Sequence, residues 1–231
     1  MSGWSLCTSP ERITDRRIAR LVFVFIIAII LVGFAKNFYL RAWLGTRPLI
    51  PTAWFHGIVR SAWLMLFAIQ IIMVARRRVD LHRRLGVLGA ALALLIVAIG
   101  VLTIVVRARI AIPGASLAQY FVVFVAFDGL SLVLFGVLVA CALRQRARPD
   151  LHRRLMTMAM VALLPPAFGR LVAYVTHDHV HIAVLSLMLL TVVLCVAIDS
   201  LRSGRIRGAS LAPGLFIVPV NGATYFVQEA T

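Results

Sequence analysis

The sequence predicts an all-α integral membrane protein, a bundle of six transmembrane helices with both termini in the cytoplasm. Two observations predict this fold class. First, 62% of the 231 residues are hydrophobic and 14% are charged, with a mean hydropathy of +0.99, whereas soluble domains carry about 25% charged residues. Second, the basic residues stand in short runs between long apolar segments, which is the pattern that membrane insertion leaves.

Six apolar segments are long enough to cross the hydrocarbon core, which takes about 20 residues of helix. They cover residues 18–35, 52–75, 85–106, 119–143, 154–174 and 180–199. Each should be helical, because an isolated strand would leave its backbone hydrogen-bonding groups unpaired in lipid. We therefore expect one transmembrane domain over residues 1–207 and a short cytoplasmic C-terminal tail over residues 208–231.

The distribution of basic residues predicts the orientation of the bundle. The N-terminus, the second and fourth connections and the C-terminal tail together contain 17 arginines, and the opposite side contains six arginines or lysines. The richer side should be cytoplasmic, and its arginine clusters should bind anionic lipids. The same clustering argues against nucleic acid as the partner of a chain with a net charge of +16. The lipid bilayer is the partner that we expect.

The hexapeptide DLHRRL occurs twice, at Asp80–Leu85 and at Asp150–Leu155. Each copy opens a transmembrane segment after an inward-running helix, so helices two and three would form a hairpin that helices four and five repeat in the same direction. One interpretation is structural, with the aspartates as helix N-caps and the arginines on lipid phosphates. In the other interpretation, His82 and His152 face each other across a pseudo-twofold axis and bind a shared group such as haem iron or a quinone.

Two ionisable residues, Arg60 and Asp128, fall inside predicted spans, where a charge normally needs a partner. At a rise of 1.5 Å per residue they lie roughly 12 and 13 Å from the outer ends of their spans. Because the depths match and the charges are opposite, we expect a buried ion pair between helices two and four.

Other polar residues gather near the same outer end. His56 lies one turn from Arg60, Arg170 lies near the outer end of helix five, and His181 ends a HDHVH run before helix six. With Asp128 they would line a ligand-binding pocket open to the outside, and the basic excess suits an anionic or carbonyl-bearing ligand. The alternative is an ion pair that only sets helix register, beside a solvated histidine loop. We expect no metal site, because no Cys or Glu cluster completes one.

The residues around the first hexapeptide resemble a known family. His56 in the second span, Gln70 near its inner end and the LHRRLG run at Leu81–Gly86 are similar to those of a family of bacterial multipass membrane proteins of unknown function. This resemblance implies a location in the bacterial inner membrane. A more distant resemblance is to di-haem cytochromes of the b561 type. It implies His82 and His152 as haem b ligands near the inner face, and His56 with one HDHVH histidine near the outer face.

Three functions stay open at this point. The first is a non-enzymatic protein that binds a small ligand in an outward-facing polar pocket among helices two, four, five and six. The second is a haem b-binding electron-transfer protein, and the third is a structural membrane component without a ligand. No hydrolase, nucleotide-binding or zinc-protease motif occurs, so we expect no catalytic residues.

Overall fold

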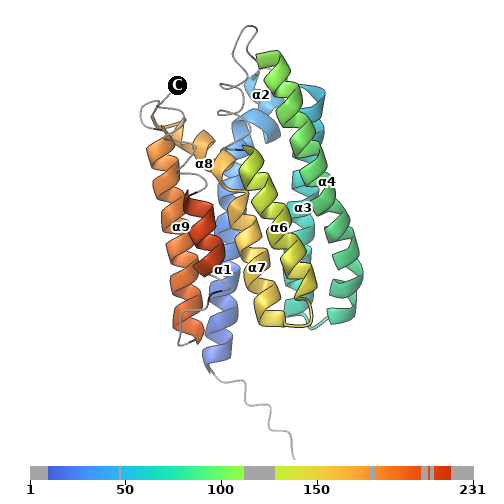
Figure 1. Cartoon of the computed structure of the whole chain (residues 1–231), viewed down its shortest axis with the longest axis vertical. Helices are drawn as coiled ribbons and strands as arrows, with labels where there is room; N and C mark the ends of the chain where they lie inside the picture. Colours follow the sequence, from blue (N-terminus) through green and yellow to red (C-terminus); the bar gives the residue numbers. More distant parts are fainter. Residues whose placement is uncertain are drawn as a thin grey trace, which may run out of the picture.

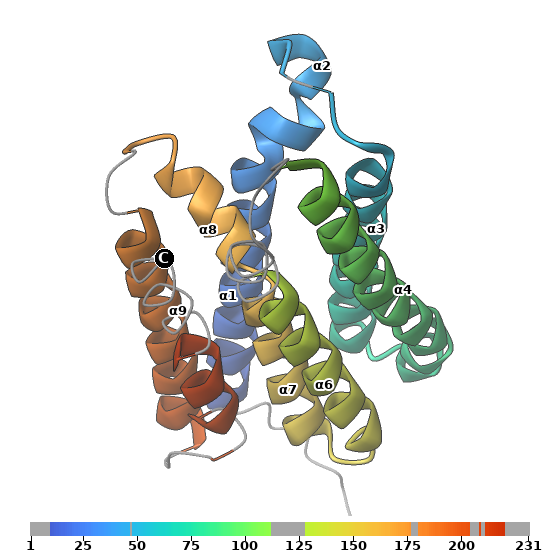
Figure 2. The ribbon, with the colours of Figure 1, turned by 45° about the horizontal axis from the view of Figure 1, so that its top comes forward.

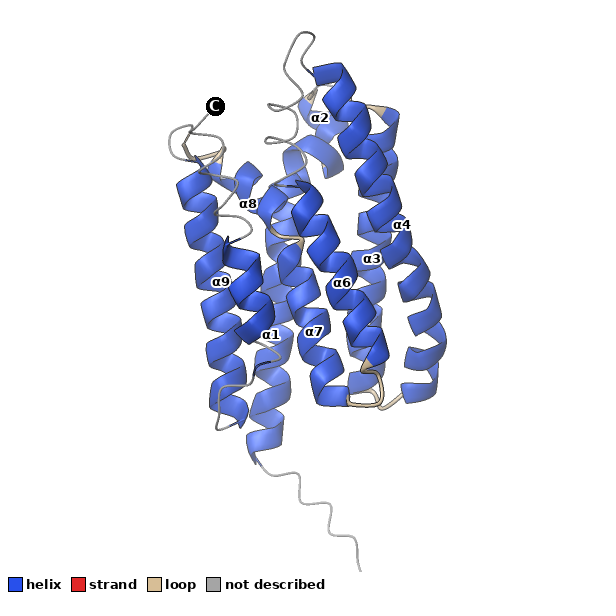
Figure 3. Cartoon of the chain, in the orientation of Figure 1, coloured by secondary structure: helices blue, strands red, loops and turns tan. Residues whose placement is uncertain are grey.

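The computed structural model describes residues 10–46, 48–111, 128–176, 180–203, 208 and 211–219, with the backbone alone at residues 10–20, 108, 111, 181 and 202–203. These residues form helices and short connections, and no strand occurs among them (Figure 3). The elements are α1 (Pro10–Phe34), the π-helix η1 (Ala35–Tyr39), α2 (Arg41–Leu44), α3 (Pro51–Ala75), α4 (Val79–Ala111), α6 (Leu130–Arg144), α7 (Pro149–Ala162), α8 (Pro165–Val172) and α9 (Val180–Ser203). Residues 211–219 form one more helix.

Helices long and apolar enough to cross a membrane confirm the expected kind of protein. Five such segments occur in the described residues, at Leu21–Tyr39, Pro51–Ala75, Val79–Arg107, Pro149–Val172 and Ile182–Leu201. α6 is apolar but shorter, and the expected fourth span at 119–143 begins outside the described residues. Val87 and Leu94 on α4 are 74% and 72% exposed, as suits a surface that faces lipid. Six spans and cytoplasmic termini stay predictions.

The fifth expected span, at 154–174, is not one continuous helix. α7 and α8 are separated by Leu163 and Leu164. α8 begins with Pro165 and Pro166, which have no amide hydrogen to donate to the preceding turn. The amides of Leu163 and Leu164 instead donate to carbonyl oxygens three residues earlier, at 3.2 and 3.0 Å. The proline pair therefore breaks this helix within the span.

Two helical hairpins make up one side of the bundle. α3 packs along α4 and α6 packs along α7, and the two tight connections lie at the end opposite α2 (Figures 1 and 2). We call these two ends of the bundle the α2 end and the hexapeptide end. α8 contacts α1 and α9, so the broken helix joins the hairpins to the outer helices. The core around it contains Trp63, Phe135, Met160 and Leu164, none more than 4% exposed.

The two hexapeptide copies have different surroundings. Asp80 and Asp150 lie within the first turns of α4 and α7, and Asp150 is not at the N-cap position that the sequence suggested, because Arg148 occupies it. Arg154 of the second copy is 8% exposed, and its Nε donates to both carboxylate oxygens of Asp199 on α9 at 2.7 and 2.8 Å. The equivalent Arg84 is exposed. That the hairpins are duplicates of one another stays a prediction.

The helix at residues 211–219 packs beside α9 (Figure 1). Ile217 is fully buried. A Cβ added at Gly214 would lie 2.5 Å from Cγ1 of Val192 on α9, so the absence of a side chain at Gly214 lets the two helices approach closely. The cytoplasmic location expected for residues 208–231 stays a prediction.

The buried Arg154–Asp199 pair should contribute strongly to stability. We expect Asp199→Asn to destabilise the protein by about 3–5 kcal/mol, because it leaves a guanidinium charge buried without its partner. The matched control is Asp150→Asn, since Asp150 makes a 3.5 Å pair with Arg153 whose side chains are 72% and 53% exposed. That change should cost about 0–1 kcal/mol. Thermal unfolding in detergent measures both, and equal losses would contradict the assignment.

Candidate functional site

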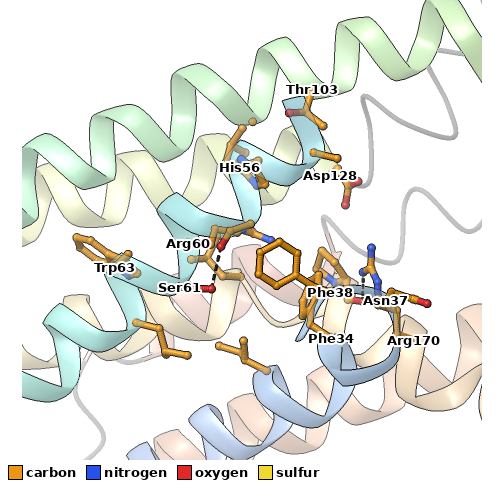
Figure 4. A pocket seen from close by; sticks show the side chains of 18 of the residues that line it. Phe34, Asn37, Phe38, His56, Arg60, Ser61, Trp63, Thr103, Asp128 and Arg170 are labelled. Atoms are coloured by element: carbon orange, nitrogen blue, oxygen red, sulfur yellow. Dashed lines mark hydrogen bonds between the residues drawn. The ribbon is translucent and has the colours of Figure 1, made fainter. Parts of the chain in front are cut away.

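A cavity of about 140 Å³ lies between the helices in the half of the bundle nearer α2, and Figure 4 shows side chains that line it. Residues of α1, η1, α3, α4, α6, α7 and α8 line it. Trp63 of α3 and Met160 of α7 belong to the wall farthest from the α2 end. The cavity therefore lies between the α2 end and the buried side chains of Trp63 and Met160.

Charged side chains from four parts of the chain meet in this cavity. Arg60 comes from α3, Arg107 from α4 and Arg170 from α8, and Asp128 lies just before α6. Among the described lining residues, three guanidinium groups face one carboxylate, which leaves an excess of two positive charges. Uncompensated charge at membrane depth is costly and normally marks a binding or transport site.

The ion pair expected between Arg60 and Asp128 is not among the salt bridges that the described residues form. Asp128 is nevertheless near enough to act electrostatically on both Arg60 and Arg170. Arg60 Nε is buried and has no hydrogen-bond acceptor. One carboxylate is thus shared at longer range by two arginines, and each arginine keeps donors for another acceptor.

Arg170 is held in place by two neighbours. Its Nη1 donates to the carbonyl oxygen of Pro166, one turn earlier on α8, at 2.6 Å. Its guanidinium carbon lies 4.3 Å from the centroid of the Phe34 ring on α1, a cation–π contact that orients the planar group. The remaining N–H groups of Arg170 can therefore meet an anion with little further loss of side-chain freedom.

His56, which the sequence also singled out, lines the same cavity. Its Nδ1 is buried without a partner. A Cβ added at Gly100 of α4 would lie 3.1 Å from Cε1 of His56 and 2.5 Å from Cδ2 of Leu132. Gly100 therefore lets α3 and α6 approach α4 at this level, and it keeps His56 at the cavity wall.

Four of the five expected ligand-binding residues, His56, Arg60, Asp128 and Arg170, line the same cavity. The fifth, His181, lies in the first turn of α9, and its side chain is outside the described residues. Sequence reasoning missed Arg107, because it placed this residue in an outer loop. The signal was the spacing of Gly100, Thr103 and Arg107, which puts all three on one helix face and into the cavity.

A second polar cluster lies at the hexapeptide end. The rings of His82 on α4 and His152 on α7 have centroids 6.3 Å apart and are nearly perpendicular, at 88°. The structure thus brings together the histidines of the two hexapeptides. His152 Nδ1 must donate to the carbonyl oxygen of Ala142, 2.8 Å away, because a carbonyl can only accept. Its Nε2 is therefore left as the atom with a free lone pair.

The surroundings of the histidine pair leave room for a further group. His82 Nδ1 is buried and has no hydrogen-bond partner. Gly86, one turn after His82, would have no atom within 4 Å of an added Cβ. In the described part of the chain, no group of three or more His, Cys, Asp or Glu side chains is placed to bind a metal ion. The pair can therefore supply two nitrogen ligands and no third residue of these types.

The charge balance of the cavity predicts the effect of removing Asp128. We expect Asp128→Asn to lower the midpoint of thermal unfolding by several degrees, because three guanidinium groups would then repel one another without a counter-charge. Adding Arg60→Gln should restore part of the loss. Melting curves of the single and double variants in detergent measure this coupling. Additive losses would show that the two residues do not interact.

Comparison with known proteins does not identify a family for this chain. No protein-family model, no curated protein and no solved structure matches it. The cavity and the histidine pair are therefore the features of this chain that bear on its function.

Proposed function

We propose that this protein binds a small anion in an outward-facing cavity formed by α3, α4, α6 and α8. It would reside in the bacterial inner membrane with both termini in the cytoplasm and its exposed arginines on anionic lipids. The observation that carries the proposal is the convergence of Arg60, Arg107 and Arg170 with Asp128 as their one carboxylate among the described lining residues.

Charge favours an anion as the ligand. An excess of two positive charges in a space bounded by apolar helices is stabilised most by two negative charges. A dianion with several oxygen atoms also matches the planar N–H donors of arginine, which bind carboxylate and phosphate in pairs. We therefore infer a phosphate-like or dicarboxylate ligand.

Size limits this ligand to a small molecule. A water molecule needs at least about 10–15 Å³ of cavity volume. The cavity of about 140 Å³ therefore holds several waters or one small anion. His56 Nδ1, which is unpartnered, adds one hydrogen bond and discriminates between ligands of similar charge.

Binding of inorganic phosphate and of succinate to the purified protein tests this function. We expect a measurable affinity for at least one of them by isothermal titration calorimetry. Arg170→Gln should weaken it about tenfold or more, because a charge-assisted hydrogen bond contributes about 1.5–3 kcal/mol.

Arg109→Gln is the matched control, because Arg109 is exposed on α4 and does not line the cavity. It should bind like the unaltered protein. Equal weakening by both substitutions would contradict a specific site. No binding of either anion would sink the proposal and favour a structural component without a ligand.

The histidine pair favours a second candidate function, binding of haem b for electron transfer. His82 and His152, whose ring centroids lie 6.3 Å apart, would hold the haem iron as its two histidine ligands. The bond from His152 Nδ1 to Ala142 is of the kind that orients a metal-binding histidine, and the open space at Gly86 suits a bulky group. Bound haem would supply one-electron redox chemistry.

An absorbance spectrum tests the second candidate. Protein produced with ample haem should show a Soret band if His82 and His152 bind it, and His82→Ala or His152→Ala should abolish that band. Leu81→Ala is the control, because Leu81 is exposed beside His82 and should leave the spectrum unchanged. A spectrum without the band in the unaltered protein would end the haem proposal.

A further inference from the structure

Unpartnered buried polar atoms are concentrated on one helix. In the described residues, six that carry such atoms are Thr52, His56, Arg60, Gln70, His82 and Ser131. Four of these six residues lie on α3. Buried polar groups are nearly always hydrogen-bonded to protein or to water, so atoms without a protein partner mark places where water or a polar ligand fits.

The four residues of α3 share one face of the helix. Thr52, His56 and Arg60 follow one another at intervals of four, and Trp63, Phe67 and Gln70 continue at intervals of three, four and three. Such spacing puts all six on one stripe. From Thr52 to Gln70 the stripe is about 27 Å long at 1.5 Å per residue, close to the hydrocarbon thickness of about 30 Å.

Only an aromatic layer interrupts this stripe. Trp63 is 4% exposed and lines the cavity. Its ring meets Phe135 of α6 edge-on at a centroid distance of 5.4 Å and lies 6.2 Å from Phe67, which stacks on Phe23 of α1 at 5.2 Å. We call these four residues the aromatic layer. They separate the cavity from the polar atoms of Gln70 nearer the hexapeptide end.

Polar atoms continue on the other side of the aromatic layer. Both amide atoms of the Gln70 side chain are buried and unpartnered. His82, whose Nδ1 is also unpartnered, lies beside the backbone of Gln70. The aromatic layer is therefore the apolar barrier between the polar atoms on its two sides along this face of α3.

We propose that the inner face of α3 is the wall of a transmembrane pathway for the small anion, and that this structure is closed at the aromatic layer. The inference rests on the proposed binding function and adds transport to it. Trp63 is the central residue of the barrier, because it borders the cavity and contacts both α6 and α7. Its Nε1 donates to Met160 Sδ at 3.3 Å, three residues before the break between α7 and α8. Movement at this break would shift Met160 and free the Trp63 side chain from this hydrogen bond.

Cysteine labelling tests the pathway without knowledge of the ligand. In a background in which Cys7, Cys141 and Cys195 are replaced by serine, Thr52→Cys and Gln70→Cys should react with a membrane-impermeant thiol reagent from opposite sides of the membrane. Intact spheroplasts and inverted vesicles give access to the two sides. Met65→Cys is the matched control, because Met65 lies on α3 at 63% exposure on the other face. It should react from neither side.

Trp63→Ala tests the barrier directly. In this variant Gln70→Cys should become reactive from the Thr52 side as well, and flux of labelled phosphate or succinate into proteoliposomes should rise about tenfold or more. Trp54→Ala is the control, since Trp54 is 44% exposed on α3, and it should leave the flux unchanged. If Trp63→Ala does not fold, Trp63→Phe should show a smaller increase.

The outcomes separate this inference from the binding function. Reaction of Thr52→Cys and Gln70→Cys from the same side, or no reaction of Gln70→Cys from either side, would overturn the pathway. Anion binding in calorimetry without flux in any variant would also overturn it and leave the binding function standing. The absence of both binding and flux would count against the binding function itself.

Discussion

The arrangement of the buried charged residues depends on one constraint. A charge or an unpaired polar group inside hydrocarbon costs free energy. The constraint is met in two ways. Arg154 and Asp199 satisfy each other directly, with both hydrogen bonds between 2.7 and 2.8 Å. Arg60 and Arg170 do not, because both lie within electrostatic range of the single carboxylate of Asp128. The first arrangement fixes two helices to one another, and the second leaves more positive than negative charge among the described residues that line the cavity.

The helical fold with membrane-spanning segments and four of the polar residues that line the cavity were predictable from the sequence. Hydropathy alone indicates the spans, because a helix that crosses lipid must be apolar over most of its length. Depth within a span predicted one level for Arg60 and Asp128, and His56 and Arg170 were expected near the same outer end. The direct Arg60–Asp128 ion pair was wrong because depth says nothing about rotation or about other charges, and Asp128 acts electrostatically on Arg170 as well as on Arg60.

Two other misses had signals in the sequence. The Pro165–Pro166 pair removes two successive amide donors, so a break in the fifth span could have been predicted. Asp199 is the last residue of the last expected span, and a carboxylate at that boundary was a signal that it needs a partner. What the sequence could not supply was the choice of partner, because Arg84 and Arg154 belong to identical hexapeptides and only packing against α9 distinguishes them.

The contact between α7 and α9 also has a consequence for the order of events during synthesis. Asp199 leaves the ribosome 45 residues after Arg154. Until it does, the guanidinium group lacks the carboxylate that it binds in the folded protein. The packing of α7 against α9 can therefore be completed only after α9 has been made, so these two helices should reach their final arrangement together.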